Sequence, residues 1–180
     1  MRVTDKYVFF WGGELSNFHP CDIEFVYNKQ TIKCVSSEQF FMWWKAITFN
    51  DHETADLILK AENPKEAKKL GRKVKDFNDD TWNLKKEDVM RVALYKKFTQ
   101  NKELRDFLLN PEFDGKTFVE ASPYDKIWGV GLEETDPLID DEKNWKGQNL
   151  LGKWMNWVRE IIKIENENLN LNNELNNKNW

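Results

Sequence analysis

Cysteine and histidine are scarce in this sequence of 180 residues, which contains only two of each. The cysteines, Cys21 and Cys34, do not form a CxxC motif. So few sulfur and imidazole ligands argue against a zinc site of ordinary ligand spacing, and the simplest interpretation is two free thiols in a reducing compartment. We expect neither a bound metal nor another cofactor.

Long apolar runs and a strong excess of one charge are also missing. No segment approaches the roughly 18 consecutive apolar residues that suggest a membrane span, and the N-terminus lacks the basic-then-apolar pattern of a signal peptide. The net charge of -4 argues against a generally basic nucleic-acid-binding coat, but it leaves room for a local basic groove. We therefore expect a cytoplasmic protein without a membrane partner.

Aromatic residues, by contrast, are abundant, with nine Trp and twelve Phe. A chain of this length can form one domain with a sizeable core, and here that core should be built largely from rings. From residue 165 the composition becomes Asn-rich and too poor in apolar groups to pack well. We predict a domain over 1–164 and a frayed tail over 165–180, in which Leu171 and Leu175 could extend the last helix by one or two turns.

The segment 36–49, SSEQFFMWWKAITF, is the centre of the predicted core. Ser36 and Gln39 have the spacing of a capping box, and a helix that is apolar nearly all round is a buried helix. Glu38 and Lys45 lie seven residues apart and so project from nearly the same face. They could form a structural ion pair, the lysine could snorkel to solvent, or both could serve as catalytic groups in a pocket. The residues alone leave these alternatives open.

The other elements follow from hydrophobic periodicity and from cap and turn residues. Strands are predicted at 6–11, 22–27, 31–35 and 116–121, with a turn at Asn28-Lys29 between the second and third. Helices are predicted at 51–61, 64–70, 85–99, 101–109 and 148–164. The buried face of the helix at 85–99 is expected to consist of Val89, Val92, Ala93 and Phe98. This pattern is typical of a mainly α-helical domain with a few short strands.

Three polar clusters interrupt the aromatic pattern: Glu38 with Lys45, the loop at Ser16-Asn17, and Asp125 beside Trp128. A cleft with rings, carboxylates and an amine suits a ligand that has a flat base and a sugar. A basic run around Arg72 could bind a phosphate, although taken by itself the run favours a solvated surface segment.

Six segments carry a more specific signal, because they occur in a fixed order between about Tyr7 and Arg159. They are GGELSNFHP, SSEQFFMWWKA, NPKEAKKLGRKV, KKFTQN, VEASPYDKIWGVGL and WKGQNLLGKWM. Together they resemble the NADAR family, also called YbiA-like. The resemblance implies a mainly α-helical (orthogonal) domain with short strands near the N-terminus and before the DxxWG segment at 125–129.

The same resemblance implies hydrolysis of N-glycosidic bonds to ribose. The activity we expect is removal of ADP-ribose from guanine bases in nucleic acid, and the alternative is cleavage of ribosylated aminopyrimidine intermediates of riboflavin biosynthesis. A third alternative, of another class, is a non-catalytic module that binds ADP-ribose or a nucleotide. The expected partners are ADP-ribose or a phosphoribosyl-type small molecule, with ADP-ribosylated nucleic acid as a further candidate substrate.

The family's motifs match this sequence at Glu38, Lys45, Asp125, Trp128 and Trp82, and the other expected site residues are chosen from their chemistry. The resemblance implies that Lys45 is catalytic, acting covalently or by orienting the electrophile. Glu38 would activate water or hold ribose hydroxyls, and Asp125 would supply a second carboxylate. The expected substrate-binding residues are Trp82, Trp128, Ser16, Asn17, Arg72 and Gly129.

Overall fold

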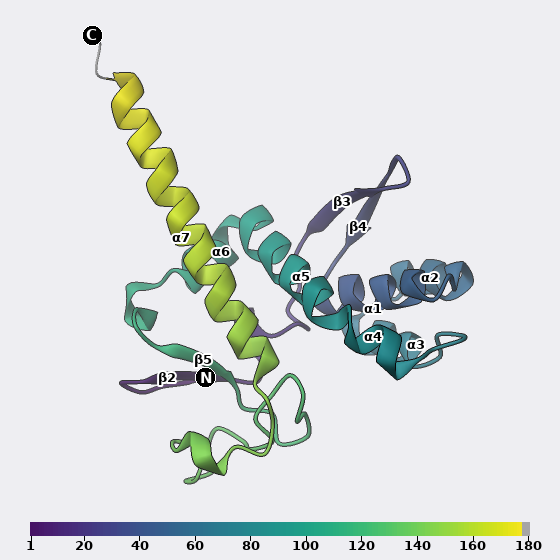
Figure 1. Cartoon of the computed structure of the whole chain (residues 1–180), viewed down its shortest axis with the longest axis horizontal. Helices are drawn as coiled ribbons and strands as arrows, with labels where there is room; N and C mark the ends of the chain where they lie inside the picture. The colour runs from purple at the N-terminus through teal and green to yellow at the C-terminus, as the bar shows by residue number, and fades with distance from the viewer. Residues whose placement is uncertain (178–180) are drawn as a thin grey trace.

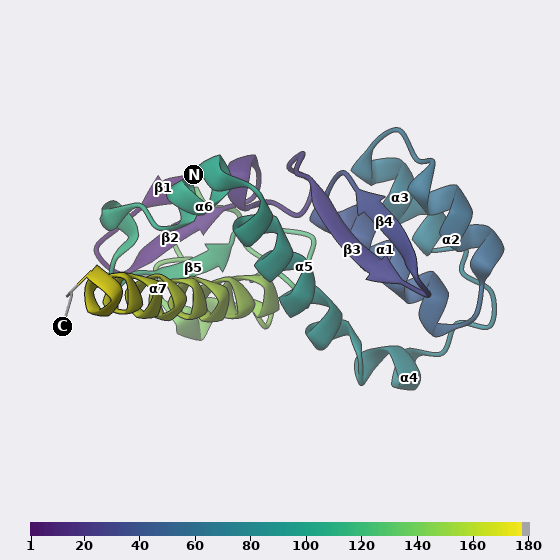
Figure 2. The same cartoon turned by 90° about the horizontal axis from the view of Figure 1, so that it is seen from above.

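The computed structural model describes the backbone of residues 1–177 and the side chains of residues 1–170. The fold is mainly α-helical with a few short strands, as the sequence predicts. The elements form two groups that lie next to each other, and α5 (Lys86–Gln100) runs between them (Figures 1 and 2). The first group contains a three-stranded sheet and the C-terminal helix, and the second contains a β-hairpin and the helix predicted at 36–49. Within the described backbone, no helix is both long enough and apolar enough to cross a membrane.

A three-stranded sheet lies in the first group. Its strands are β1 (Arg2–Val3), β2 (Tyr7–Phe10) and β5 (Thr117–Glu120), in the order β1-β2-β5. The β2 and β5 strands are parallel, and Phe10 is paired with Glu120. The carboxyl ends of both strands therefore lie at the same end of the sheet, so the loops that follow the strands meet although they are distant in the sequence.

The free edge of β5 is covered by side chains that precede or belong to α7 (Leu150–Asn177). Asn149 donates to the Phe118 carbonyl and accepts from the Glu120 N–H, both at 3.0 Å. Asn156 accepts from the Phe118 N–H at 3.1 Å. These amides replace the partner strand that an unpaired edge lacks.

The buried helix predicted at 36–49 is α1 (Ser37–Thr48), in the second group. The Ser36 hydroxyl accepts from the Gln39 N–H at 3.1 Å, as in a capping box. The Gln39 side chain instead accepts from the Val35 N–H and donates to the Ile58 carbonyl, each at 2.8 Å. The capping residue is thus confirmed, but the glutamine joins α1 to α2 (His52–Leu59) rather than closing the box.

A hairpin made of β3 (Ile23–Tyr27) and β4 (Gln30–Cys34) extends beside α1 (Figure 2). Its turn residues Asn28 and Lys29 have φ of 48° and 65°, the left-handed conformations that two-residue hairpin turns require. The predicted turn is confirmed. The remaining elements are η1 (Gly13–Leu15), α3 (Pro64–Gly71), α4 (Asp79–Asn83), α6 (Lys102–Leu108), η2 (Pro111–Phe113) and η3 (Glu142–Asn144).

Two helices differ from their predictions. On α5, Val92 is 45% exposed whereas Lys97 is fully buried, so the predicted inward stripe is wrong at Val92. The α7 helix continues to Asn177 instead of ending at residue 164. The side chains of Leu171 and Leu175, and all of residues 178–180, lie outside the described part, so the boundary predicted at residue 164 stays a prediction.

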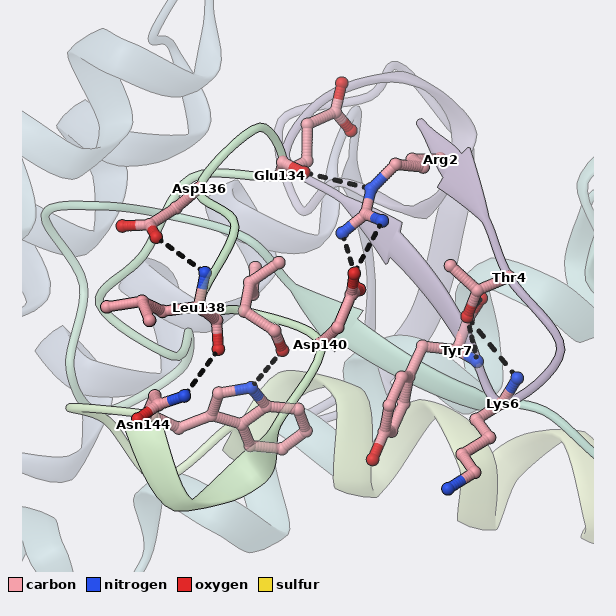
Figure 3. Close-up of polar contacts among 11 residues, drawn as sticks. Arg2, Thr4, Lys6, Tyr7, Glu134, Asp136, Leu138, Asp140 and Asn144 are labelled. Carbon is pink, nitrogen blue, oxygen red and sulfur yellow. Dashed lines mark hydrogen bonds and ion pairs between the residues drawn. The ribbon is translucent and has the colours of Figure 1, made fainter.

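An acidic loop at 133–142 folds over β1 and is held there by Arg2 (Figure 3). Arg2 donates to both carboxylate oxygens of Asp140, at 2.8 and 3.2 Å, and to the Glu134 carbonyl at 3.0 Å. The Trp145 indole N–H donates to the Ile139 carbonyl at 2.8 Å. The Asp140 carboxylate therefore has a fixed structural partner.

Candidate active site

A cavity of about 690 Å³ lies where the carboxyl ends of β2 and β5 meet α1 and α3. Ligands commonly bind beyond the carboxyl ends of parallel strands, where the following loops converge. The lining residues come from these four places and, through Met90, from α5: Trp11, Ser16, Asn17, Phe18, Glu38, Phe41, Met42, Lys68, Arg72, Met90, Glu120, Ser122, Tyr124, Asp125, Lys126, Ile127 and Trp128.

Glu38 enters the cavity from the first turn of α1. It is 5% exposed, and its Oε1 has no hydrogen-bond partner within the described chain. Burial raises the pKa of Glu38 to about 7, and nearby Asp125 acts in the same direction, while Lys68 and Arg72 partly oppose the shift. The Glu38 N–H donates to the Asn17 carbonyl at 3.0 Å, which joins the helix to the loop after β2.

Glu120 is a second carboxyl group in the cavity, and the sequence analysis did not identify it as a site residue. It is the last residue of β5, and its buried Oε2 lacks a partner among the residues that the structure describes. Burial raises the pKa of Glu120 to about 8, with further contributions from Asp125 and Glu38. Two carboxyl groups with raised pKa values on one cavity are candidates for proton transfer to and from a ligand.

Asp125 also lines the cavity, but one of its oxygens organises a turn. Its Oδ1 accepts from the N–H groups of Ile127 and Trp128, at 2.9 and 2.7 Å. The Trp128 ring lines the same cavity and contacts Phe41 edge-to-face, with 5.4 Å between centroids. The structure thus brings Asp125, Trp128 and Glu38 together, as the sequence analysis expected of a site.

Trp82 and Gly129 are placed differently, since neither belongs to the cavity lining. Trp82 is buried in the core with its ring 5.0 Å from that of Phe41. A Cβ at Gly129 would lie 2.9 Å from the Glu120 carbonyl oxygen and 3.0 Å from that of Asp125. Both residues support lining residues from behind: Trp82 supports Phe41, and Gly129 allows the loop to close on the end of β5.

Ser16 and Asn17 line the cavity on a loop that is held by an unexpected residue, Lys97. The Lys97 Nζ donates to the Ser16 carbonyl at 2.8 Å from a fully buried position on α5, and burial lowers the pKa of Lys97 to about 8. The Asn17 Oδ1 is buried and, within residues 1–170, unpartnered. A lysine in the KKFTQN segment was the available sequence signal, but its burial depends on packing that the sequence does not display.

Lys68 and Arg72 bring positive charge into the cavity from α3 and its C-terminal cap. They are four residues apart and therefore share one helical face. The Lys68 Nζ lies 5.4 Å from the centroid of the Phe18 ring. The basic run around Arg72 is thus part of the cavity wall, and Lys68 is a further site residue that the sequence analysis did not name.

Lys45 is half-buried on α1 and is not among the residues that line the cavity. Its Nζ lies 3.9 Å from the centroid of the Phe77 ring. No ion pair joins Lys45 to Glu38 in the described structure. Burial lowers the pKa of Lys45, which favours the neutral amine. No group of three His, Cys, Asp or Glu side chains in the described residues is arranged to hold a metal ion.

Similar proteins and a similar solved structure are known. Protein irg-1 of Caenorhabditis elegans is 42% identical over 136 residues, which are 74% of this chain but only 63% of irg-1, so this chain matches less than two thirds of that protein. N-glycosidase R617 of Acanthamoeba polyphaga mimivirus is 38% identical over 166 residues, covering 87% of this chain and 96% of that protein.

The NMR structure of the E. coli protein YbiA superposes with a TM-score of 0.69 at 29% identity, covering 92% of this chain and 89% of that one. The family model of the NADAR domain matches residues 9–163, which include every residue named above as lining the cavity. This chain therefore belongs to the NADAR domain family.

Proposed function

We propose that this protein is a hydrolase that cleaves the N-glycosidic bond between ribose and a base. The observation that carries the proposal is the pair Glu38 and Glu120, two carboxyl groups with raised pKa values and one unpartnered buried oxygen each within the described residues, on one cavity. The mimivirus relative bears the name N-glycosidase, which supports the same reaction class.

The reaction requires an acid at the base and a base at the attacking water. As the C1′–N bond breaks, positive charge develops on the ribose and the base departs with the bonding electrons. Glu120, with a pKa of about 8, is largely protonated at neutral pH and can donate a proton to the departing nitrogen. Glu38, with a pKa of about 7, is partly ionised and can accept a proton from water. The Asp125 carboxylate would stabilise the developing cation.

The atoms balance over one turnover. The water oxygen bonds to C1′, one water proton passes to Glu38, and the base nitrogen receives the proton of Glu120. The products are the free base and a sugar with a hydroxyl at C1′, and proton exchange with solvent restores both carboxyl groups. One water molecule is consumed, and no oxidant or reductant is needed.

A covalent route through Lys45 is the second proposed mechanism. A neutral Lys45 amine would attack C1′ while the base leaves with the proton of Glu120. The C1′–O4′ bond then breaks, O4′ takes a proton from the new ammonium, and water hydrolyses the resulting ring-opened iminium to the sugar and the protonated lysine, which returns its proton to Glu120. The lowered pKa of Lys45 favours this route. Its Nζ must first leave the Phe77 ring and turn towards the cavity. Sodium borohydride added during turnover would trap the sugar on Lys45 if this route operates.

For the substrate we propose ADP-ribose attached to guanine in nucleic acid. Lys68 and Arg72 on the cavity wall support a substrate that carries phosphate. The ribosylated aminopyrimidine intermediates of riboflavin biosynthesis are the alternative substrates. A non-catalytic ADP-ribose-binding module is the alternative of another class, but it would have no need of Glu38 and Glu120 as a pair of raised pKa.

The decisive experiment offers both substrates in parallel to the wild-type protein and to Glu38→Gln and Glu120→Gln. Base release is followed by liquid chromatography with mass spectrometry, and binding of free ADP-ribose by calorimetry. Release of free ADP-ribose and recovery of the unmodified oligonucleotide by the wild type alone is the expected result. If neither substrate is cleaved but free ADP-ribose still binds, the protein is a non-catalytic binding module and not a hydrolase.

A further inference from the structure

Two exposed aromatic rings stand at the edge of the cavity. Trp11 follows β2 directly and Tyr124 lies four residues beyond the end of β5. The side chains are 52% and 83% exposed, and their ring centroids are 5.9 Å apart at an interplanar angle of 51°. The parallel pairing of Phe10 with Glu120 is what brings the two rings together.

This arrangement leaves a large aromatic surface in water. Aromatic rings are usually buried, and a contiguous exposed apolar patch beside a cavity commonly marks a binding site. Trp11 and Tyr124 contact each other, but their high exposure shows that most of their surface is unoccupied. A flat heteroaromatic base can stack on such faces regardless of its hydrogen-bonding pattern.

The position of the pair relates it to the proposed chemistry. Trp11 and Tyr124 line the same cavity as Glu38 and Glu120. Glu120 ends β5 and Tyr124 follows within the same loop, so one short segment carries both the proposed acid and a ring. A ligand whose sugar lies against the carboxyl groups can therefore place an attached base at the rings.

We propose that Trp11 and Tyr124 form a stacking subsite for a flat heteroaromatic base, and that this subsite makes the cavity prefer base-bearing ligands over bare sugar phosphates. The inference rests on the proposed function, which places the sugar of the ligand against Glu38 and Glu120. The stacked base has two sources, the base that leaves or the adenine of ADP-ribose, and the ligands used below distinguish them.

The test is calorimetric titration of guanosine, ADP-ribose and ribose 5-phosphate into the wild type and into Trp11→Ala and Tyr124→Ala. Each alanine variant is expected to weaken binding of base-bearing ligands about 5- to 100-fold, while ribose 5-phosphate binds as in the wild type. Trp11→Phe keeps a ring and should recover most of the affinity. Trp157→Ala is the matched control, because that ring is 42% exposed on α7 and does not line the cavity.

Weakening of guanosine alone assigns the subsite to the leaving base, and weakening of ADP-ribose alone assigns it to the adenine. Equal affinity of the wild type for ribose 5-phosphate and for both base-bearing ligands would overturn the inference. An equal loss of affinity for all three ligands in the alanine variants would also overturn it, because that result indicates general distortion of the cavity. The titrations measure affinity, and chromatography measures product release separately, so failure of the proposed hydrolase and failure of the subsite are distinguishable.

Discussion

Glu38 and Glu120 in the cavity and Asp140 in the acidic loop at 133–142 carry the same chemical group in opposite surroundings. In the loop, the Asp140 side chain is 56% exposed and both its oxygens accept from Arg2 (Figure 3). In the cavity, Glu38 and Glu120 have raised pKa values, and each keeps one buried oxygen without a partner in the described part of the chain.

This difference shows that residue type alone does not identify a reactive carboxyl group. A carboxylate with a fixed partner is held in its charged form and in one orientation, whereas an unpartnered buried one is available to a ligand. Loop 133–142 is the more acidic region by sequence, yet its Asp140 carboxylate holds the loop onto β1 through Arg2. The sparser carboxylates of the cavity are those expected to do chemistry.

The largest effect is expected at Lys45, which belongs to neither group. Lys45→Ala should abolish base release if the covalent route operates, while the free energy of unfolding changes by only about 0.5–1 kcal/mol because a half-exposed cation–π contact with Phe77 is lost. Turnover assays and denaturant melts measure the two quantities. Full activity in this variant would leave hydrolysis to the carboxyl groups alone.

The next effect directly contrasts the two carboxyl regions. Glu38→Gln and Glu120→Gln should each lower kcat about 100- to 10,000-fold, because each removes a proposed proton-transfer group without changing its shape. Asp140→Asn is the matched control and should stay within about twofold of the wild type. Near-normal turnover in both glutamine variants would show that the cavity carboxyl groups are as inert as those of the loop.

The pH profile of kcat/KM should follow the two raised pKa values. Glu38 must lose its proton, with a pKa of about 7, and Glu120 must keep its proton, with a pKa of about 8. The rate should therefore rise to about pH 7 and fall above about pH 8, by up to tenfold per pH unit on each side. In Glu120→Gln the residual rate should lose the alkaline limb. An unchanged alkaline limb in that variant would assign it to another group.

Stability should fall with rising pH over the acidic range in which activity rises. Because the pKa of Glu120 is raised from 4.5 to about 8 on folding, the folded state binds more protons between these values, and stability is lost as pH rises through this range. Glu120→Gln cannot ionise at this position, so at pH 9 its free energy of unfolding should exceed that of the wild type by about 5 kcal/mol, and the two should match near pH 4.5. Calorimetry at both pH values measures the difference, and a less stable variant at pH 9 would contradict it.

The smallest effect is expected in the loop. Asp140→Asn removes an exposed ion pair with Arg2, and such pairs contribute about 0–1 kcal/mol. Added salt should shrink even this difference, because exposed charges are screened. A loss of several kcal/mol, measured by chemical denaturation, would mean that the loop contributes more to the fold than its exposure indicates.

Local features of the fold were predictable because they depend on neighbouring residues. Ser36 caps α1, and Asn28-Lys29 forms the predicted turn. Glu120 was missed as a site residue because its position depends on the pairing of β5 with β2, which no local sequence pattern predicts. Lys97 was missed because a lysine on a helix ordinarily faces solvent, and only the docked loop at Ser16 explains its burial.

The face of α1 was predicted more accurately than its partners. Spacing along a helix correctly placed Glu38 in a buried position, but it suggested Lys45 as a neighbouring charge. The structure instead brings Lys68 and Arg72 from α3 to the cavity, while Lys45 contacts Phe77. Helical spacing reports which residues share a side of one element, and it does not report which other element packs there.

The amide contacts on β5 have a consequence for assembly. On that edge, Phe118 bonds through its N–H and carbonyl to Asn156 and Asn149, and Glu120 bonds through its N–H to Asn149 and through its carbonyl to Val130. A sheet edge grows by recruiting a strand from another molecule only where such groups are free. This edge offers none at Phe118 and Glu120, so the strand that carries the proposed acid is closed to edge-to-edge aggregation and to strand exchange.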